Sequence, residues 1–213
     1  MTFGGLPTRW EPAGESRGLA LVAPGRAYPP SAPLLDFARI ALLQHGFTVQ
    51  QLWWDSTSRG DEEPEPWVRR HVEAALAAED ADHVVVVGKS LGTRAASYAA
   101  ERGLDAVWFT PLLVDPTVAE AVAANPGRQL LVGGLLDELW DATTARELAD
   151  NGCAVLEVPD ADHGMGTPDA VRTAGRPVRA RRARGRGSCR RAPTGWVVLR
   201  RSCLDHAART ARK

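Results

Sequence analysis

Residues 82–103 read DHVVVVGKSLGTRAASYAAERG, and this stretch decides the fold. Four consecutive valines, residues 84–87, are typical of a strand that is covered on both faces of a sheet. A short turn that contains two glycines follows them, and residues 91–102 then have a helical pattern. A buried strand that turns sharply into a helix predicts one unit of a parallel α/β sheet.

The same alternation of strand and helix continues on both sides of this stretch. It predicts right-handed crossovers and an open, mostly parallel, twisted sheet flanked by helices. The expected strands are residues 19–23, 47–53, 84–87, 106–109, 130–132 and 155–158. The expected helices are residues 33–45, with Ser31 as N-cap, and residues 66–79, 91–102, 116–124 and 143–151.

The charge distribution divides the chain, although its 213 residues have a formal net charge of zero. Residues 172–213 contain 13 arginines, one lysine and a single acid, Asp205, which gives a formal net charge of +13. Residues 1–171 have a formal net charge of −13. We therefore expect a poorly defined N-terminal segment (1–17), one α/β domain (18–175) and an arginine-rich tail (176–213). The tail is expected to be disordered, because like charges repel and few apolar residues are available for a core.

The tail allows three interpretations: an RNA-binding arm, a solvated disordered segment, or the translation of a shifted reading frame in a GC-rich gene. Basic segments bind phosphate backbones, but Trp196 alone could stack on bases. We therefore do not expect nucleic-acid binding, although the tail leaves it open. Thr167 and Pro168 are typical of a helix start, as cap and first turn, but the pattern is then lost among arginines.

Composition indicates a soluble globular protein, with 44% hydrophobic and 24% charged residues. No run approaches the roughly 18 apolar residues of a membrane span, and the N-terminus does not resemble a secretory signal. Cys153, Cys189 and Cys203 fit neither a disulfide framework nor a metal site with paired spacing. The expectation is a cytoplasmic protein without metal or cofactor.

The turn at residues 88–92 fits two motifs. Gly88-Lys89-Ser90 ends like a phosphate-binding loop, but the first glycine of that motif falls on His83, and the valines between resist the bending that a phosphate cradle needs. The alternative motif, G-x-S-x-G, is the nucleophile elbow, which needs glycine on both sides of the serine. Because Gly88 and Gly92 flank Ser90, we predict that Ser90 is a nucleophile. An unreactive serine in a tight turn remains the alternative until its partners are identified.

A serine nucleophile needs a base, which is itself oriented by an acid, and on this fold the chain order is serine, acid, histidine. The sequence after Ser90 contains two histidines, His163 and His206. His206 lies in the tail. His163 follows the last expected strand, which is where the base must lie, so His163 is the predicted base.

The predicted acid is Asp137, in the loop after the expected strand at 130–132. Glu138 and Asp141 are nearby alternatives, and Asp115, on the loop after the preceding strand, is the runner-up. Loop carboxylates are commonly helix caps or solvated charges instead.

An oxyanion hole requires two N–H donors. One is expected to be the backbone N–H of Leu91, the residue after the nucleophile. The other is expected from the loop after the first core strand, with Arg26 as the best candidate and Ala27 next.

These residues resemble those of α/β-hydrolases over about residues 18–171, at LVAPGR, GKSLG, VGGLLD and DADHG. The resemblance is closest to small members without a lid, of the dienelactone-hydrolase type. GKSLGTRAAS is also similar to the elbow of bacterial relatives of a hydrolase-like domain in a nuclear acetyltransferase complex. The resemblance implies a Ser90–Asp137–His163 triad. The chain departs from the family in having Pro24-Gly25 where many members have His-Gly, in barely visible N-terminal strands, and in an arginine tail in place of the final helix.

The sequence therefore predicts a serine hydrolase that cleaves small carboxylic esters or thioesters through an acyl-enzyme. With no long insertion for a lid, the site should be open, and residues 53–67 could form one wall. The alternative is a non-catalytic hydrolase-like scaffold that binds a protein partner. No oligomeric state follows from the sequence.

Overall fold

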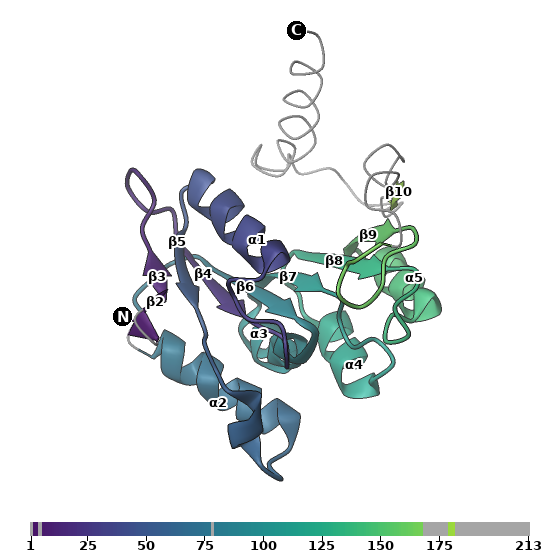
Figure 1. Cartoon of the computed structure of the whole chain (residues 1–213). Coiled ribbons are helices and arrows are strands. Elements are labelled where there is room, and N and C mark those ends of the chain that lie inside the picture. The colour runs from purple at the N-terminus through teal and green to yellow at the C-terminus, as the bar shows by residue number, and fades with distance from the viewer. Residues whose placement is uncertain (1, 4–5, 78, 168–178, 182–213) are drawn as a thin grey trace, which may run out of the picture.

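The computed structural model of the chain describes residues 2–3, 6–77, 79–167 and 179–181. Figure 1 shows a central sheet with helices packed on it. The strands are β1 (Thr2–Phe3), β2 (Leu6–Pro7), β3 (Arg9–Trp10), β4 (Leu19–Ala23), β5 (Thr48–Gln51), β6 (Val84–Lys89), β7 (Asp105–Phe109), β8 (Gln129–Gly134), β9 (Ala154–Val158) and β10 (Arg179–Arg181). The helices are α1 (Pro33–Gln44), α2 (Pro64–Leu76), α3 (Ala96–Arg102), α4 (Pro116–Ala124) and α5 (Ala142–Asp150), with short 3-10 helices η1 (Ser56–Arg59) and η2 (Ser90–Ala95).

Among the described residues, one sheet contains eight strands in the order β10-β9-β8-β7-β6-β4-β5-β3. Strands β4 to β9 pair in parallel, and within this sheet the edge strands β3 and β10 pair antiparallel. Strands β1 and β2 form a separate antiparallel pair. The predicted open, mostly parallel sheet flanked by helices is therefore confirmed. All six expected strands are present, and four of the five expected helices are found with shifts of a few residues at their ends.

The remaining expected helix, residues 91–102, differs in form. Residues 90–95 make the 3-10 helix η2, and the α-helix α3 begins only after it.

The predicted cap of α1 is wrong. Ala32, not Ser31, is the N-cap residue, and it makes no side-chain capping bond. The hydroxyl of Tyr28 accepts the N–H of Leu34 instead, at 3.1 Å. The first N–H groups of a helix have no partner within the helix. Here Tyr28, from the preceding loop, supplies a partner for one of them.

The two faces of the sheet bury separate cores, because successive side chains of a strand point to opposite faces. Leu21, Val86 and Trp108 pack with α2, α3, α4 and α5 on one face. Val22 and Val85 pack with Leu35 of α1 on the other. The uniformly apolar strands of the sequence are explained by this double burial.

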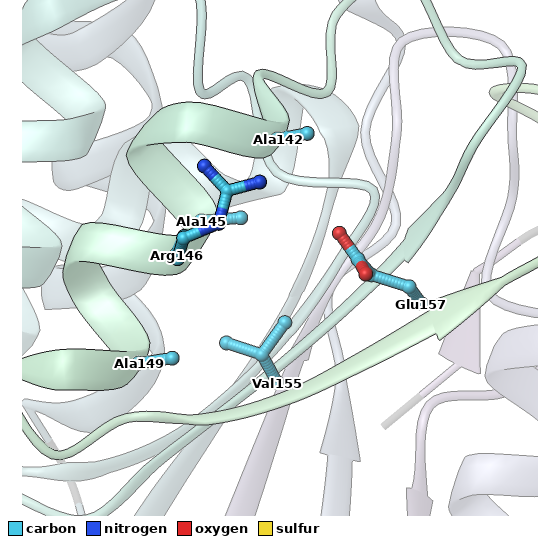
Figure 2. A pocket seen from close by; sticks show the side chains of 6 residues that line it. All are labelled: Ala142, Ala145, Arg146, Ala149, Val155 and Glu157. Atoms are coloured by element: carbon cyan, nitrogen blue, oxygen red, sulfur yellow. The ribbon is translucent and has the colours of Figure 1, made fainter. Parts of the chain in front are cut away.

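Small side chains allow α5 to lie close to the sheet. Figure 2 shows Ala142, Ala145 and Ala149 of α5 turned toward β9, with Val155 facing them. Ala145, Ala149 and Val155 are buried. This contact packs α5 against β9, the strand that precedes the loop with His163.

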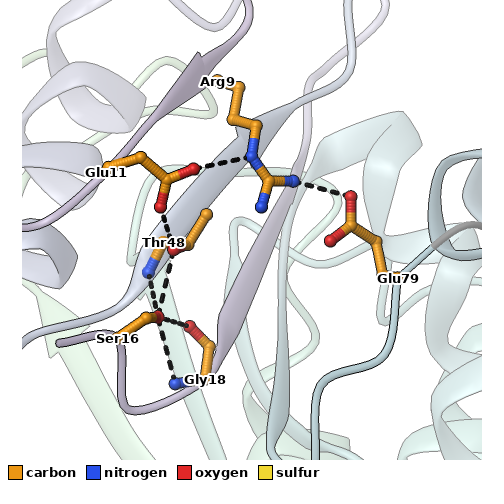
Figure 3. Close-up of polar contacts among 6 residues, drawn as sticks. All are labelled: Arg9, Glu11, Ser16, Gly18, Thr48 and Glu79. Atoms are coloured by element: carbon orange, nitrogen blue, oxygen red, sulfur yellow. Dashed lines mark hydrogen bonds and ion pairs between the residues drawn. The ribbon is translucent and has the colours of Figure 1, made fainter.

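The N-terminal segment joins the opposite edge of the sheet. Arg9 and Trp10 pair with β5, and Arg9 also bonds to Glu11 and to Glu79 at 2.8 and 2.6 Å (Figure 3). Thr48 of β5 contacts Glu11 in turn. The sheet therefore extends into residues 1–17, which the sequence pattern left undefined.

These polar residues line a cavity of about 400 Å³, together with residues 80–83, which precede β6. The cavity lies at the amino ends of β4 and β6. Ser90 directly follows the carboxyl end of β6, so the cavity and Ser90 are at opposite edges of the sheet.

At the other end of the chain, β10 pairs antiparallel with β9. Of the tail predicted to be disordered (176–213), the structure describes only these three residues. The residues after Thr167, where the sequence resembles a helix start, lie outside the described residues up to position 178. In the part of the chain that is described, no helix has the length and apolar character needed to cross a membrane.

The strand order predicts a ligand site at the carboxyl edge of the sheet. Strand β4 lies between β5 and β6. The chain after β4 leads to α1 on one face, and the chain after β6 leads to α3 on the other. Loops that diverge in this way open a crevice outside the carboxyl ends of the strands, where ligands bind in open α/β sheets.

Candidate active site

Ser90 directly follows β6 and is the first residue of η2, in a tight turn. Its φ of 51° is unusual for a residue with a side chain. A Cβ on Gly92 would lie 2.1 Å from the carbonyl oxygen of Ala23, and one on Gly88 would lie 2.7 Å from the carbonyl oxygen of Gly92. Both glycines are therefore required by close backbone contacts, as an elbow of this kind needs.

The imidazole of His163 lies between a hydroxyl and a carboxylate. Its Nε2 is 2.8 Å from Oγ of Ser90, and its Nδ1 is 2.8 Å from Oδ2 of Asp137. These three side chains come from the loops after β6, β8 and β9, so the structure brings together the three residues that the sequence analysis selected.

Asp137 is shielded from water, whereas the histidine is accessible. The side chain of Asp137 is 0% exposed and that of His163 is 34% exposed. The second carboxylate oxygen of Asp137, Oδ1, accepts the N–H of Leu139 at 2.9 Å. Both oxygens of the buried carboxylate thus have partners, which holds the group in a single orientation.

The acid loop and the histidine loop are joined through their backbones. The N–H of Leu136 donates to the carbonyl of Ala161 at 2.9 Å, and that of Leu135 donates to Val158 at 3.1 Å. A Cβ on Gly134 would lie 2.2 Å from the same Ala161 oxygen. Gly134, the second glycine of VGGLLD, therefore lets the two loops approach each other closely.

The other candidate carboxylates have different partners. Asp115 caps α4 by accepting the N–H of Thr117, and it forms an ion pair with Arg94. Burial acts to raise the pKa of Asp115, but the hydrogen bonds from Thr117 and the charge of Arg94 hold that pKa below its usual value. Asp141 caps α5, and Glu138 is exposed. The other candidate base, His206, lies outside the described residues.

The predicted oxyanion loop packs against the elbow. A Cβ on Gly92 would lie 2.8 Å from the carbonyl oxygen of Pro24, just before Arg26 and Ala27. Leu91 lies in the first turn of η2, where N–H groups have no partner within the helix. The N–H groups of Leu91 and Arg26 remain the predicted donors, with Ala27 as the alternative.

The segment expected to form a wall also contacts this loop. The hydroxyl of Ser56 donates to the carbonyl of Arg26 at 2.9 Å, and the indole N–H of Trp54 donates to that of Gly25 at 3.4 Å. Residues of the segment 53–67 therefore support the loop that carries the second predicted donor.

Lys89 is a site residue that the sequence analysis did not select. Its side chain is buried, with 2% exposure, and its Nζ donates to the backbone carbonyl of His163 at 2.9 Å. Burial lowers the pKa of Lys89 to about 8, although the negative charges of Asp137 and Asp162 oppose that shift. No group of three or more acidic, histidine or cysteine side chains in the described ranges could hold a metal ion.

Comparison with known proteins gives structural matches only, since no family model and no curated protein matches the chain. Est1E from Butyrivibrio proteoclasticus, one of whose structures holds ferulic acid, is 14% identical with a TM-score of 0.61, over 78% of this chain and 90% of that one. The dienelactone hydrolase from Anabaena variabilis is 20% identical with a TM-score of 0.59, over 78% and 85%. A serine hydrolase without a lid from Xanthomonas campestris is 18% identical with a TM-score of 0.58, over 74% and 79%.

The chain has the α/β-hydrolase fold. The resemblance deduced from the sequence motifs is confirmed at this level, and the similarity includes lidless and dienelactone-hydrolase proteins. In this fold the nucleophile sits on the turn after a central strand, and here the turn after β6 carries Ser90.

Proposed function

We propose that this protein is a serine hydrolase that cleaves small carboxylic esters or thioesters through an acyl-enzyme. One observation carries the proposal: the His163 imidazole contacts Ser90 Oγ through one nitrogen and the buried Asp137 carboxylate through the other. This arrangement has the geometry of a nucleophile, a base and an orienting acid.

In the first half-reaction, the Ser90 oxygen attacks the ester carbonyl carbon while Nε2 of His163 takes the hydroxyl proton. Asp137 holds the proton on Nδ1 and stabilises the imidazolium that forms. The oxygen that carries the negative charge of the tetrahedral intermediate accepts hydrogen bonds from the backbone N–H groups of Leu91 and Arg26. The bond to the leaving group then breaks, and Nε2 gives its proton to the departing alcohol or thiol.

In the second half-reaction, water replaces the alcohol or thiol. His163 takes a proton from the water, whose oxygen attacks the acyl carbon. The resulting intermediate collapses, the bond to Ser90 breaks, and the serine oxygen recovers the proton from Nε2. The products are a carboxylic acid and the free enzyme.

The surroundings of the triad favour small apolar substrates. Leu135 and Leu136, beside Asp137, are 49% and 57% exposed, and Val114 on the loop after β7 is 52% exposed. Apolar side chains at the carboxyl edge of the sheet would contact an uncharged ester group. The partially exposed His163 is consistent with a site that substrates enter without the opening of a lid.

Covalent labelling with a fluorophosphonate probe tests the proposal, because the probe reacts with activated serine nucleophiles. We expect one probe molecule per chain, lost in Ser90→Ala and kept in Ser16→Ala, which removes an exposed serine hydroxyl at the opposite edge of the sheet. Wild-type protein that does not label would reject the hydrolase and favour the scaffold alternative.

A further inference from the structure

Lys89 and the histidine loop make a contact that the triad does not explain. Lys89 is the last residue of β6 and directly precedes Ser90. Its Nζ reaches the backbone carbonyl of His163, a residue 74 positions away, at 2.9 Å. A hydrogen bond from a charged donor is roughly twice as strong as one between neutral groups. The strand that carries the nucleophile is thus bonded directly to the main chain of the histidine.

Burial makes the location of Lys89 costly for a cation, although nearby groups compensate in part. The Nζ lies 4.8 Å from the centroid of the Tyr28 ring, on the loop after β4. The charged and titratable groups that face it are Tyr28 from that loop, Asp137 from the loop after β8, and Asp162 and His163 from the loop after β9. A buried ammonium group destabilises a fold unless it is compensated.

The backbone bonds of the histidine loop lie on either side of His163. Before it, Ala161 accepts the N–H of Leu136 from the acid loop. Asp162 holds the following residues, since its Oδ1 accepts the N–H groups of Gly164 and Gly166, both at 2.8 Å. Those bonds shape the loop from within and do not attach it to the sheet. Lys89 supplies a bond from the sheet to the residue that bears the imidazole.

We propose that Lys89 is a positioning residue whose ammonium group holds the backbone of His163 and so keeps the imidazole between Ser90 and Asp137. The effect on turnover rests on the proposed hydrolase function, whereas the effect on the His163 contacts does not. Loss of the ammonium charge leaves a neutral amine, which is a weaker donor to the His163 carbonyl. The loop then loosens, and the hydrogen bonds at Nδ1 and Nε2 lengthen. A displacement of about 1 Å in a catalytic group can lower the rate about 100-fold.

The first test measures geometry and needs no substrate. The proton on Nδ1 that bonds to Asp137 gives a far-downfield proton NMR resonance, assigned by its absence in His163→Gln. At pH 7 we expect this resonance in the wild type and its loss or broadening in Lys89→Met, which has a similar length but no charge and no donor. Arg39→Met is the matched control, because it removes a cation that also lies over a ring, 4.7 Å from the centroid of Trp10, but on α1. It should leave the resonance unchanged.

The second test uses the pH dependence of turnover. The sequence contains only two lysines, Lys89 and Lys213, so nitrogen-15 labelling of lysine allows the Lys89 titration to be followed directly. In the wild type and in Arg39→Met, kcat for p-nitrophenyl acetate should fall over the pH range in which Lys89 loses its proton. Lys89→Met should have a kcat about 10- to 100-fold lower at pH 7 with little change in KM, and no such fall above pH 8.

The comparison of kcat with the Lys89 titration uses wild-type protein, so it tests the inference even if Lys89→Met does not fold. A Lys89→Met protein that keeps the downfield resonance and the wild-type kcat would overturn the inference, as would a wild-type kcat that stays constant while Lys89 titrates. Full activity in Ser90→Ala would reject the proposed function, and the resonance at pH 7 would still decide whether Lys89 positions the histidine.

Discussion

The Oγ atom of Ser90 and the Nε2 atom of His163 lie 2.8 Å apart, although 73 positions separate these residues in the chain. The parallel sheet explains the contact. Ser90 follows the carboxyl end of β6, and the loop of His163 follows the carboxyl end of β9. Because all parallel strands point the same way, these ends lie at one edge of the sheet, where residues distant in sequence can form a single site.

Asp137 should matter for turnover far more than Asp115. An amide at position 137 cannot stabilise the imidazolium and favours the wrong tautomer of His163. We expect Asp137→Asn to lower kcat for p-nitrophenyl acetate by about 100-fold or more, and Asp115→Asn, which alters the α4 cap and the pair with Arg94, to affect mainly stability. An inactive Asp115→Asn enzyme beside an active Asp137→Asn enzyme would move the acid to the earlier loop.

Gly92 should be intolerant of any side chain. A Cβ at this position would lie 2.1 Å from the Ala23 carbonyl oxygen, so Gly92→Ala must displace the backbone of β4 or of the elbow. We expect a loss of about 1–3 kcal/mol in the free energy of unfolding, measured by urea denaturation. Gly14→Ala is the control, because nothing lies within 4 Å of its Cβ position. Equal stability of the two variants would show that the elbow is less tightly packed than described.

Burial of Lys89 should make stability depend on pH in a defined direction. Its pKa falls from 10.5 to about 8 on folding, so the unfolded chain binds more protons between these values. The free energy of unfolding contributed by Lys89 therefore rises with pH across this window and levels off above it. We expect the stability difference between wild type and Lys89→Met to shift in favour of the wild type from pH 8 to pH 10 in urea titrations. A constant difference would show that the folded pKa is not lowered.

The arginine-rich tail should contribute little to stability. A chain that ends at residue 175 is expected to melt within a few degrees of the full chain, because like charges and few apolar residues offer little to offset the entropy of ordering. A second truncation, after Arg181, retains β10, which pairs with β9. Comparison of the two melting temperatures separates the contribution of this edge strand from that of residues 182–213. Limited trypsin digestion should remove the tail first. A large drop in melting temperature for both truncations would indicate that the tail packs on the domain, for example over Phe37 and Ile40, which are 70% and 36% exposed.

The sheet and the chain order of the site were predictable because they depend on local patterns. Uniformly apolar runs indicated the doubly covered strands, and the loops after them had to meet at one edge. Ser90, Asp137 and His163 were selected on that basis, and the structure brings their side chains into contact. Their catalytic roles stay predictions.

What could not be predicted depends on tertiary contacts. Lys89 follows a valine run as an ordinary strand-end lysine would, and nothing local indicates that its ammonium group is buried against His163. The start of α1 is satisfied by Tyr28 rather than by the neighbouring Ser31, because the preceding loop folds back on the helix. Strand β3 has only two residues, too few for any alternation of polar and apolar side chains.

Hydrolysis of p-nitrophenyl acetate by Ser90→Ala, compared with wild type and Ser16→Ala, tests the central claim most directly. If His163 activates Ser90 as the nucleophile, removal of this hydroxyl should lower kcat by about 1,000-fold or more, while Ser16→Ala, at the opposite edge of the sheet, keeps the wild-type rate. Wild-type activity in Ser90→Ala would contradict the account, because the acyl-enzyme could not then form on this serine.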